Sequence, residues 1–188
     1  MTTGSVSPRR ADTRRNHERI LIVAAEELTT SGEVSFNAIA KKAKVGVGTV
    51  YRHFPTAEAL ILAVYKREVR QLVDVAQSLL TTHTPAAAFR VWVTEHLARA
   101  MMTKRGLAKA FGVATANREL PSSAYDAMVG AVATLLEANV EAGTVRAGVA
   151  PATVMRGLGG LFYLDPNDDW RAQSADLADL LWRGMKAE

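Results

Sequence analysis

The stretch that ends at Pro55 brings together four side chains that can donate hydrogen bonds. They are Thr49, Tyr51, Arg52 and His53. Two apolar residues among them, Val50 and Phe54, stand one helical turn apart, so a short helix here turns both inward and the donors outward. Hydroxyl, guanidinium and imidazole groups on an exposed helix can bind phosphates or base edges. The chemistry that this stretch predicts is therefore the binding of nucleic acid.

A second short helix is expected just before this one. Its apolar residues recur at i, i+3, i+4 and i+7, the spacing of one helical face: Phe36, Ile39, Ala40 and Ala43. Ser35 is a good N-cap, because its hydroxyl can accept a hydrogen bond from an amide of the first turn. The residues Lys44-Val45-Gly46 end the helix. Two short helices joined by a tight turn form a helix-turn-helix, whose second helix enters the major groove of DNA.

The positive charge of the chain is concentrated at its beginning. Residues 1–66 contain ten Lys or Arg and six Asp or Glu, whereas residues 67–188 contain thirteen of each, so the net charge of +4 belongs to the first third. A basic end on a neutral body indicates a polyanion contacted at that end. A solvated charged tail is the alternative, and the helix-turn-helix favours DNA.

The composition argues against several other classes of protein. The sequence has no Cys, so it can form neither a disulfide nor a Cys-based metal site. Its four histidines lack the spacing of a metal site: His17, His53, His83 and His96. No apolar run approaches the length of about 18 residues that a membrane span needs, and the N-terminus lacks the pattern of a signal peptide. We expect a cytoplasmic protein with no enzymatic activity, cofactor, metal or membrane contact.

Helical periods and helix-ending residues divide the chain into about nine helices, and no strand pattern occurs. Besides the two short helices, they are expected at residues 12–31, 57–80, 85–103, 105–115, 122–142, 151–164 and 169–185. Residues 1–11 are small, polar and basic, and we expect them to form a disordered arm. The sequence therefore predicts an all-α fold in two domains, with the helix at 57–80 long enough to belong to both.

The segment GVGTVYRHFP, which runs from Gly46 to Pro55, resembles the signature of TetR-family transcription regulators, as does the TAEAL that follows it. Upstream, Arg19-Ile20-Leu21 and Ile39-Ala40 are similar to the first two helices of that family. Two residues depart from its pattern. Lys44 stands where the family usually has Gly, so a residue with a side chain must adopt the turn conformation at some strain. Ala57 replaces a Lys that the family often uses against a DNA phosphate.

The resemblance implies a helix-turn-helix DNA-binding domain at residues 12–56 and a helical effector-binding and dimerisation domain at 57–188. It implies a homodimeric, ligand-responsive regulator, a repressor that a small apolar or amphipathic effector releases from its double-stranded DNA operator. By position in the motif, the residues expected to contact DNA are Arg14, Arg15, Ser35, Lys44, Val47, Gly48, Thr49, Tyr51, Arg52 and His53. A cytoplasmic small-molecule-binding helical protein whose head no longer reads DNA is the alternative function.

Two further sets of residues are expected in the second domain. An effector pocket, which is mostly apolar with a few polar groups, could be lined by Trp92, His96, Met101, Phe111, Tyr125, Met128 and Phe162. Such side chains at helical spacing are more often core, and that alternative stays open.

The second set is a dimer interface. Glycines inside a helix cost about 1 kcal/mol each, which close approach of another helix offsets. The resemblance implies that the last two helices pack with their copies in a four-helix bundle, through Gly157, Gly160, Leu161, Trp170, Leu177 and Leu181. Close packing within one chain is the alternative explanation of the glycines.

Overall fold

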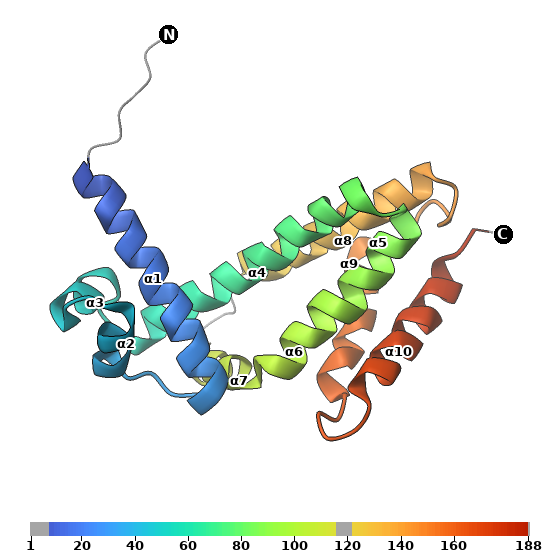
Figure 1. Cartoon of the computed structure of the whole chain (residues 1–188). Coiled ribbons are helices and arrows are strands. Elements are labelled where there is room, and N and C mark those ends of the chain that lie inside the picture. Colours follow the sequence, from blue (N-terminus) through green and yellow to red (C-terminus); the bar gives the residue numbers. More distant parts are fainter. Residues whose placement is uncertain (1–7, 116–121, 188) are drawn as a thin grey trace, which may run out of the picture. The chain divides into compact units, whose positions relative to one another are not determined.

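A computed structural model describes residues 8–115 and 122–187, and this part of the chain is built from helices (Figure 1). The first four are α1 (Pro8–Ser31), α2 (Phe36–Ala43), α3 (Val47–His53) and α4 (Ala57–Thr82). The next is continuous through α5 (Pro85–Val91), the π-helical η1 (Trp92–Ala98) and α6 (Arg99–Thr103). It is followed by α7 (Arg105–Thr115), α8 (Ser122–Glu141), α9 (Pro151–Leu158), which tightens into the 3-10 turn η2 (Gly159–Tyr163), and α10 (Trp170–Met185). Counting continuous segments as one, the described residues form nine helices, and the all-α prediction is confirmed.

Helix ends follow the local sequence signals. Side-chain N-caps begin four helices, each accepting a bond from an amide three residues on: Ser35, Thr56, Thr84 and Asp169. Two helices end at glycines in the left-handed conformation, Gly32 with φ 70° and Gly143 with φ 68°. These signals place the observed boundaries within a few residues of the predicted ones.

The beginning of α1 differs from the expectation. The helix starts at Pro8, so residues 8–11 of the predicted disordered arm are helical, while residues 1–7 lie outside the described residues. Proline at the first helical position lacks only an amide that would have no intrahelical partner, so it is compatible with this earlier start.

The chain divides into two compact units, and α4 contributes to both. The first contains the chain up to Arg67 together with the segment that begins at Lys104, and the second starts at Glu68 and resumes after α7. The domain boundary expected from the sequence, after residue 56, assigns α7 to the second domain. In the structure, the apolar face of α7 instead completes the core of the first unit, through Leu107, Ala110 and Phe111.

A close approach of two helices explains why α7 fits there. The Cα of Gly106 lies so near the end of α1 that an added Cβ would stand 2.1 Å from the carbonyl oxygen of Leu28. The same Cβ would be 3.2 Å from the carbonyl oxygen of Thr29 and 3.3 Å from the Cα of Gly32. Glycine therefore allows the backbones of α7 and α1 to touch. Further along α7, the ring of Phe111 stacks on Tyr65 of α4 with centroids 3.8 Å apart.

The second unit has its own core, in which η1 packs with α5 and α10, and α8 with α5 and α9. Trp92 is fully buried, and its indole N–H donates to the backbone oxygen of Leu72 at 2.9 Å. Asn139 is also fully buried: its amide donates to the backbone oxygens of Pro85 and Leu135, and its side-chain oxygen accepts from the Thr144 hydroxyl. Because every polar group of this buried amide has a partner, Asn139 fixes α8 against the start of α5 at no desolvation penalty.

Gly157 of α9 and Gly160 of η2 contact α10 of the same chain. A Cβ at Gly157 would stand 2.8 Å from Leu181 Cδ2, and one at Gly160 would stand 3.2 Å from Leu177 Cδ2. Packing within one chain therefore accounts for both glycines. This was the alternative to a role between two copies.

Candidate nucleic-acid interface

The turn between α2 and α3 has the conformation that the sequence predicts to be strained. Lys44 follows α2 with φ 52° and ψ 47°, the left-handed region, and its amide donates to the backbone oxygens of Ala40 and Lys41. Among the described residues it is the one non-glycine with positive φ. A side chain in this region costs roughly 1–2 kcal/mol relative to glycine, and the left-handed turn conformation predicted for Lys44 is confirmed.

The inner face of α3 is anchored in the core of the first unit. Val50 is 0% exposed and Phe54 is 4% exposed, and both belong to the cluster that includes Ile20, Ile39 and Leu60. Val45, in the turn, is half-buried against the same cluster. Burial of these side chains gives α3 one fixed rotation about its axis, so the opposite face is presented to solvent.

The outer face of α3 carries the residues that the motif predicts to contact DNA. Val47 is 40% exposed and Tyr51 54% exposed, while Arg52 and Gly48 are also exposed and Thr49 is half-buried. A Cβ at Gly48 would meet nothing within 4 Å, so this backbone is open to close approach by a large partner. The ring of Tyr51 packs edge-on against Phe36 of α2, with centroids 4.7 Å apart, which restricts its orientation before any partner binds.

The end of α3 meets the first half of α1 through aromatic rings. The His53 and His17 centroids are 5.5 Å apart with an interplanar angle of 70°, and His17 lies 5.0 Å from the ring of Phe54. Burial lowers the pKa of His53, and the nearby charges of His17 and Arg52 lower it further. The sequence offered no signal for this pair, since its members are far apart along the chain and on different helices.

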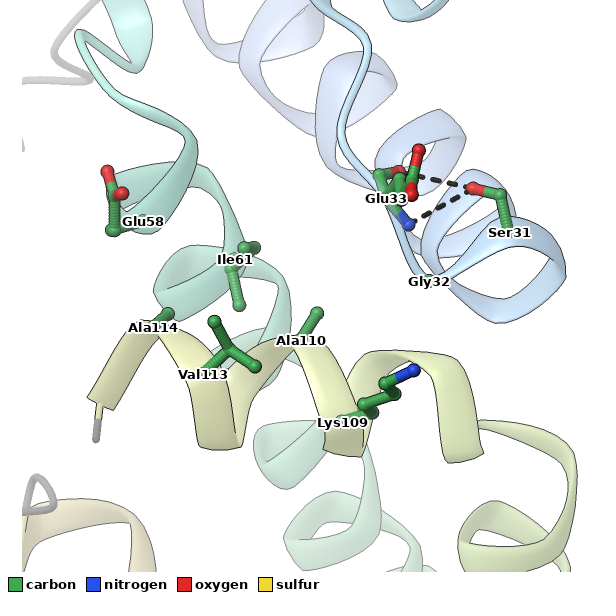
Figure 2. Close-up of a pocket in the computed structure, with 9 residues that line it drawn as sticks. All are labelled: Ser31, Gly32, Glu33, Glu58, Ile61, Lys109, Ala110, Val113 and Ala114. Carbon is green, nitrogen blue, oxygen red and sulfur yellow. Dashed lines mark hydrogen bonds between the residues drawn. The ribbon is translucent and has the colours of Figure 1, made fainter.

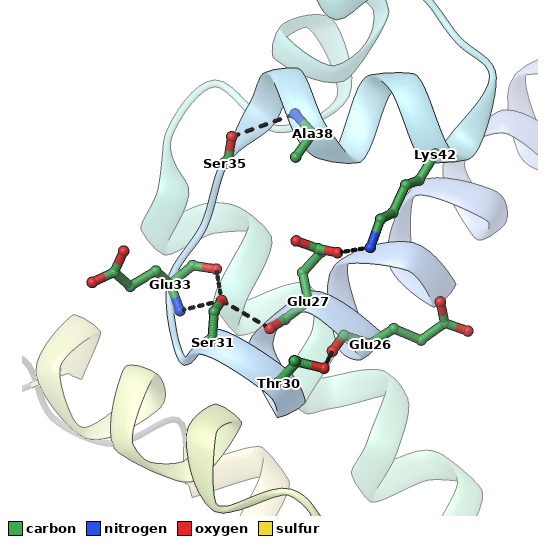
Figure 3. Close-up of polar contacts among 8 residues, drawn as sticks. All are labelled: Glu26, Glu27, Thr30, Ser31, Glu33, Ser35, Ala38 and Lys42. Carbon is green, nitrogen blue, oxygen red and sulfur yellow. Dashed lines mark hydrogen bonds and ion pairs between the residues drawn. The ribbon is translucent and has the colours of Figure 1, made fainter.

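Polar contacts join the helix-turn-helix to the end of α1 (Figure 3). The ammonium of Lys42 forms an ion pair with Glu27, and this hydrogen bond and opposite charge raise the pKa of Lys42. Ser31 donates to the backbone oxygen of Glu27 and accepts from the amide of Glu33. On α4, Arg67 Nε donates to a carboxylate oxygen of Glu18 at 2.7 Å. These contacts tie α2 and α4 to α1, which makes the first unit a firm support for α3.

Two basic residues of α1 that the motif predicts to contact DNA lie on its exposed side. Arg14 and Arg15 are both exposed, and Arg15 forms an ion pair with Asp12 one turn earlier. Ser35, also exposed, uses its hydroxyl as the cap of α2, accepting from the amide of Ala38 at 3.4 Å. Of the ten residues expected to contact DNA, none is fully buried.

The residues expected to line an effector pocket do not share one environment. Trp92 and Met128 are buried in the core of the second unit, whereas Tyr125 is 45% and Phe162 64% exposed. His96 and Met101 are half-buried, and burial lowers the pKa of His96. Phe111 lies in the other unit, stacked on Tyr65. Trp92 therefore has the environment of a core residue, the alternative that the sequence left open.

The residues expected at a dimer interface are also divided. Leu161 is fully buried, while Trp170, Leu177 and Leu181 are half-buried on α10. Their neighbours are more exposed: Phe162 at 64%, Tyr163 at 90% and Leu180 at 69%. The exposed apolar surface of η2 and α10 thus lies one residue away from the positions that the sequence suggested.

The first unit contains an open cavity of about 530 Å³ between α1, α4 and α7 (Figure 2). Its lining includes the apolar side chains of Ile61, Ala110 and Val113 and the charged side chains of Glu33, Glu58 and Lys109. Within the described ranges 8–115 and 122–187, no three His, Asp or Glu side chains lie close enough to hold a metal ion. No helix of that part is long and apolar enough to cross a membrane.

Comparison with known proteins agrees with this geometry. Residues 21–64 match the model of the TetR family of bacterial regulatory proteins, and residues 84–187 match that of the SbtR-like transcriptional regulator C-terminal domain. Among solved structures, a TetR transcriptional regulator from Streptomyces coelicolor is 32% identical, with TM-score 0.74 over 91% of this chain and 98% of that one. A TetR regulatory protein from Mycobacterium vanbaalenii is 34% identical, with TM-score 0.72 over 96% of this chain and 100% of that one.

A more distant structure, SmeT of Stenotrophomonas maltophilia, is 18% identical, with TM-score 0.65 over 94% of this chain and 93% of that one, and shares the fold. A search of curated proteins found no match. The C-terminal model alone covers more than half of the chain, and the N-terminal model covers the helix-turn-helix. The chain therefore belongs to the TetR family of transcriptional regulators.

Proposed function

We propose that this regulator is a cytoplasmic homodimeric repressor that binds a DNA operator through α3 and releases it when a small apolar or amphipathic molecule binds the second unit. The observation that carries the proposal is the division of α3 into an anchored inner face and an open outer face. Val50 and Phe54 fix the helix, while Val47, Tyr51 and Arg52 are exposed. A rigidly mounted helix with exposed donors suits insertion into a major groove.

The outer face suggests how the operator would be read. Tyr51 and Arg52 would supply hydrogen bonds to bases, because Val47 and Gly48 have no polar side-chain atoms. The open space over Gly48 would let the backbone approach the bases closely. Thr49 and His53, which are half-buried at the edge of this face, suit contacts to phosphates. Part of the specificity would then come from DNA shape.

Dimerisation is proposed through η2 and α10. Phe162, Tyr163 and Leu180 place large apolar side chains on the surface of these two segments. Large apolar side chains exposed on neighbouring elements suit an interaction surface, and a second copy would supply the two recognition helices that a two-half-site operator requires. Gly157 and Gly160 would support this surface indirectly, by holding α9 against α10.

The effector would bind in the second unit. Met101 and His96 are half-buried there and are the better candidates among the seven suggested by the sequence. SmeT, which shares the fold, is the repressor of a multidrug efflux pump. Release would require that the effector bind the DNA-incompatible state preferentially, with a typical coupling of about 1–3 kcal/mol.

An unbiased selection of duplexes bound by the purified chain tests the DNA part. We expect an enriched two-half-site sequence, with affinity that falls steeply as salt rises. Tyr51→Ala should weaken binding to that duplex roughly 5- to 150-fold, equivalent to about 1–3 kcal/mol. Tyr125→Ala, which removes a comparably exposed tyrosine on α8, is the matched control and should bind like the parent chain.

Failure to enrich any duplex would contradict the proposal and favour a small-molecule-binding protein whose head no longer reads DNA. Light scattering tests the dimer separately, since Tyr163→Glu should place a charge in the proposed interface and yield monomers.

A further inference from the structure

We propose that His17 and His53 together bind a single DNA phosphate and take up a proton when they do so. This inference rests on the proposed DNA-binding function and adds to it a residue outside the matched motif and a dependence on pH. His17 lies on α1, before the segment 21–64 that matches the family model. It was absent from the residues that the sequence suggested for DNA.

The two rings lie close enough together for one phosphate group to reach both. A nitrogen of each ring can donate a hydrogen bond of about 2.9 Å to a phosphate oxygen. The centroids of His17 and His53 are 5.5 Å apart. Both rings are half-buried, and the ring of Phe54 packs against His17, with 5.0 Å between centroids. The pair is therefore held in place and still reaches solvent.

The surroundings of the pair favour an anion. Arg52 adjoins His53 on α3 and is exposed, and Arg14 precedes His17 by one turn of α1 and is also exposed. The carboxylate nearest in sequence, Glu18, binds Arg67 of α4 at 2.7 Å. The site thus contains cationic or potentially cationic groups from two helices, with its neighbouring carboxylate already paired. A phosphate, with its single negative charge, would complete it.

The direction of the pH effect follows from the charges. In the free chain, burial and the charges of His17 and Arg52 lower the pKa of His53, so the imidazole of His53 is mostly uncharged near neutral pH. A phosphate between the rings favours the protonated form and raises that pKa. Binding then takes up a proton, so affinity for DNA rises as pH falls from about 8 and levels off once His53 of the free chain is itself protonated. If each DNA-binding unit takes up one proton, its affinity for DNA rises by up to about tenfold for each pH unit.

The experiment is a titration of the selected duplex by fluorescence anisotropy at about pH 8 and about pH 6, at one fixed salt concentration. The parent chain should bind more tightly at the lower pH. His17→Gln should lose roughly tenfold in affinity at the lower pH and little at the higher one. His17→Arg, which carries a permanent charge, should bind tightly at both. His83→Gln, a histidine of the second unit, is the control and should keep the full pH dependence.

Each outcome decides the question. An equal loss at both pH values for His17→Gln would show that the ring only packs against Phe54, and an unchanged pH dependence would show that His17 does not touch the phosphate. Either overturns this inference while leaving the DNA-binding function intact. A parent chain that binds no duplex at any pH overturns both.

Discussion

Gly106→Ala should destabilise the first unit although alanine is normally the better helix former. In an open helix this change gains up to about 1 kcal/mol. At Gly106 the new Cβ would stand 2.1 Å from the Leu28 carbonyl oxygen and 3.3 Å from the Cα of Gly32. Both neighbours are backbone atoms, which cannot rotate away. The start of α7 and the end of α1 must therefore separate.

The size of the effect follows from that separation. An ordinary contact needs the two backbones to move apart by roughly 1 Å, and forcing extra atoms into a packed site costs about 1–3 kcal/mol, occasionally more. Subtracting the helix-propensity gain leaves a net loss of stability of up to about 2 kcal/mol. The separation should also loosen the packing of Leu107 and Phe111, which enter the core from the same helix.

Urea denaturation followed by far-UV circular dichroism measures this loss, and α7 supplies its own control. Gly112 lies on the same helix, and a Cβ there would meet nothing within 4 Å. Gly112→Ala should therefore raise the midpoint of unfolding where Gly106→Ala lowers it. If both variants are equally stabilised, α7 and α1 do not touch at Gly106, and the reasoning fails.

Three further predictions concern single side chains. Trp92→Phe should destabilise the second unit by about 1–3 kcal/mol, because it shrinks a fully buried side chain and removes the donor to the Leu72 oxygen; unchanged thermal stability would show that Trp92 is not core. Lys44→Gly should raise stability by about 1 kcal/mol in urea by relieving a left-handed lysine, while weakening DNA binding if the ammonium contacts a phosphate. Because burial lowers the pKa of His96, the stability that its neutral form contributes is present above the ordinary histidine pKa of about 6.5 and lost as pH falls below it. His96→Gln should flatten this acid loss in thermal melts.

Local signals predicted the helices well because each is decided by neighbours in the chain. The cap hydroxyls of Ser35 and Thr84, the proline after Thr84 and the glycines at 32 and 143 act within a turn of their own positions. The orientation of α3 was predictable for the same reason, since the spacing of Val50 and Phe54 determines which face is buried.

Contacts between distant segments could not be predicted in this way. The sequence around Gly106 does not indicate that this glycine contacts the end of α1. Nor does the position of α7 in the chain, well after the helix-turn-helix, indicate that α7 packs in the same unit. The glycines at 157 and 160 did indicate a close approach, but not whether the approaching leucines came from the same chain. His17 and His53 form a pair only because α1 and the end of α3 meet in space.

Residues that contact DNA and residues that hold α3 in place have different roles, because α3 depends on contacts with distant segments. A helix of seven residues is too short to be stable alone, so its conformation is supplied by the core in which Val50 and Phe54 are buried. Since Phe111 of α7 belongs to the same core, loosening α7 should weaken DNA binding together with thermal stability. Tyr51→Ala, at an exposed position, should weaken DNA binding with only a small loss of thermal stability, from the contact of its ring with Phe36. The loss of DNA affinity and the loss of thermal stability should therefore be compared between Gly106→Ala and Tyr51→Ala. This comparison distinguishes a residue that supports α3 from one that contacts DNA.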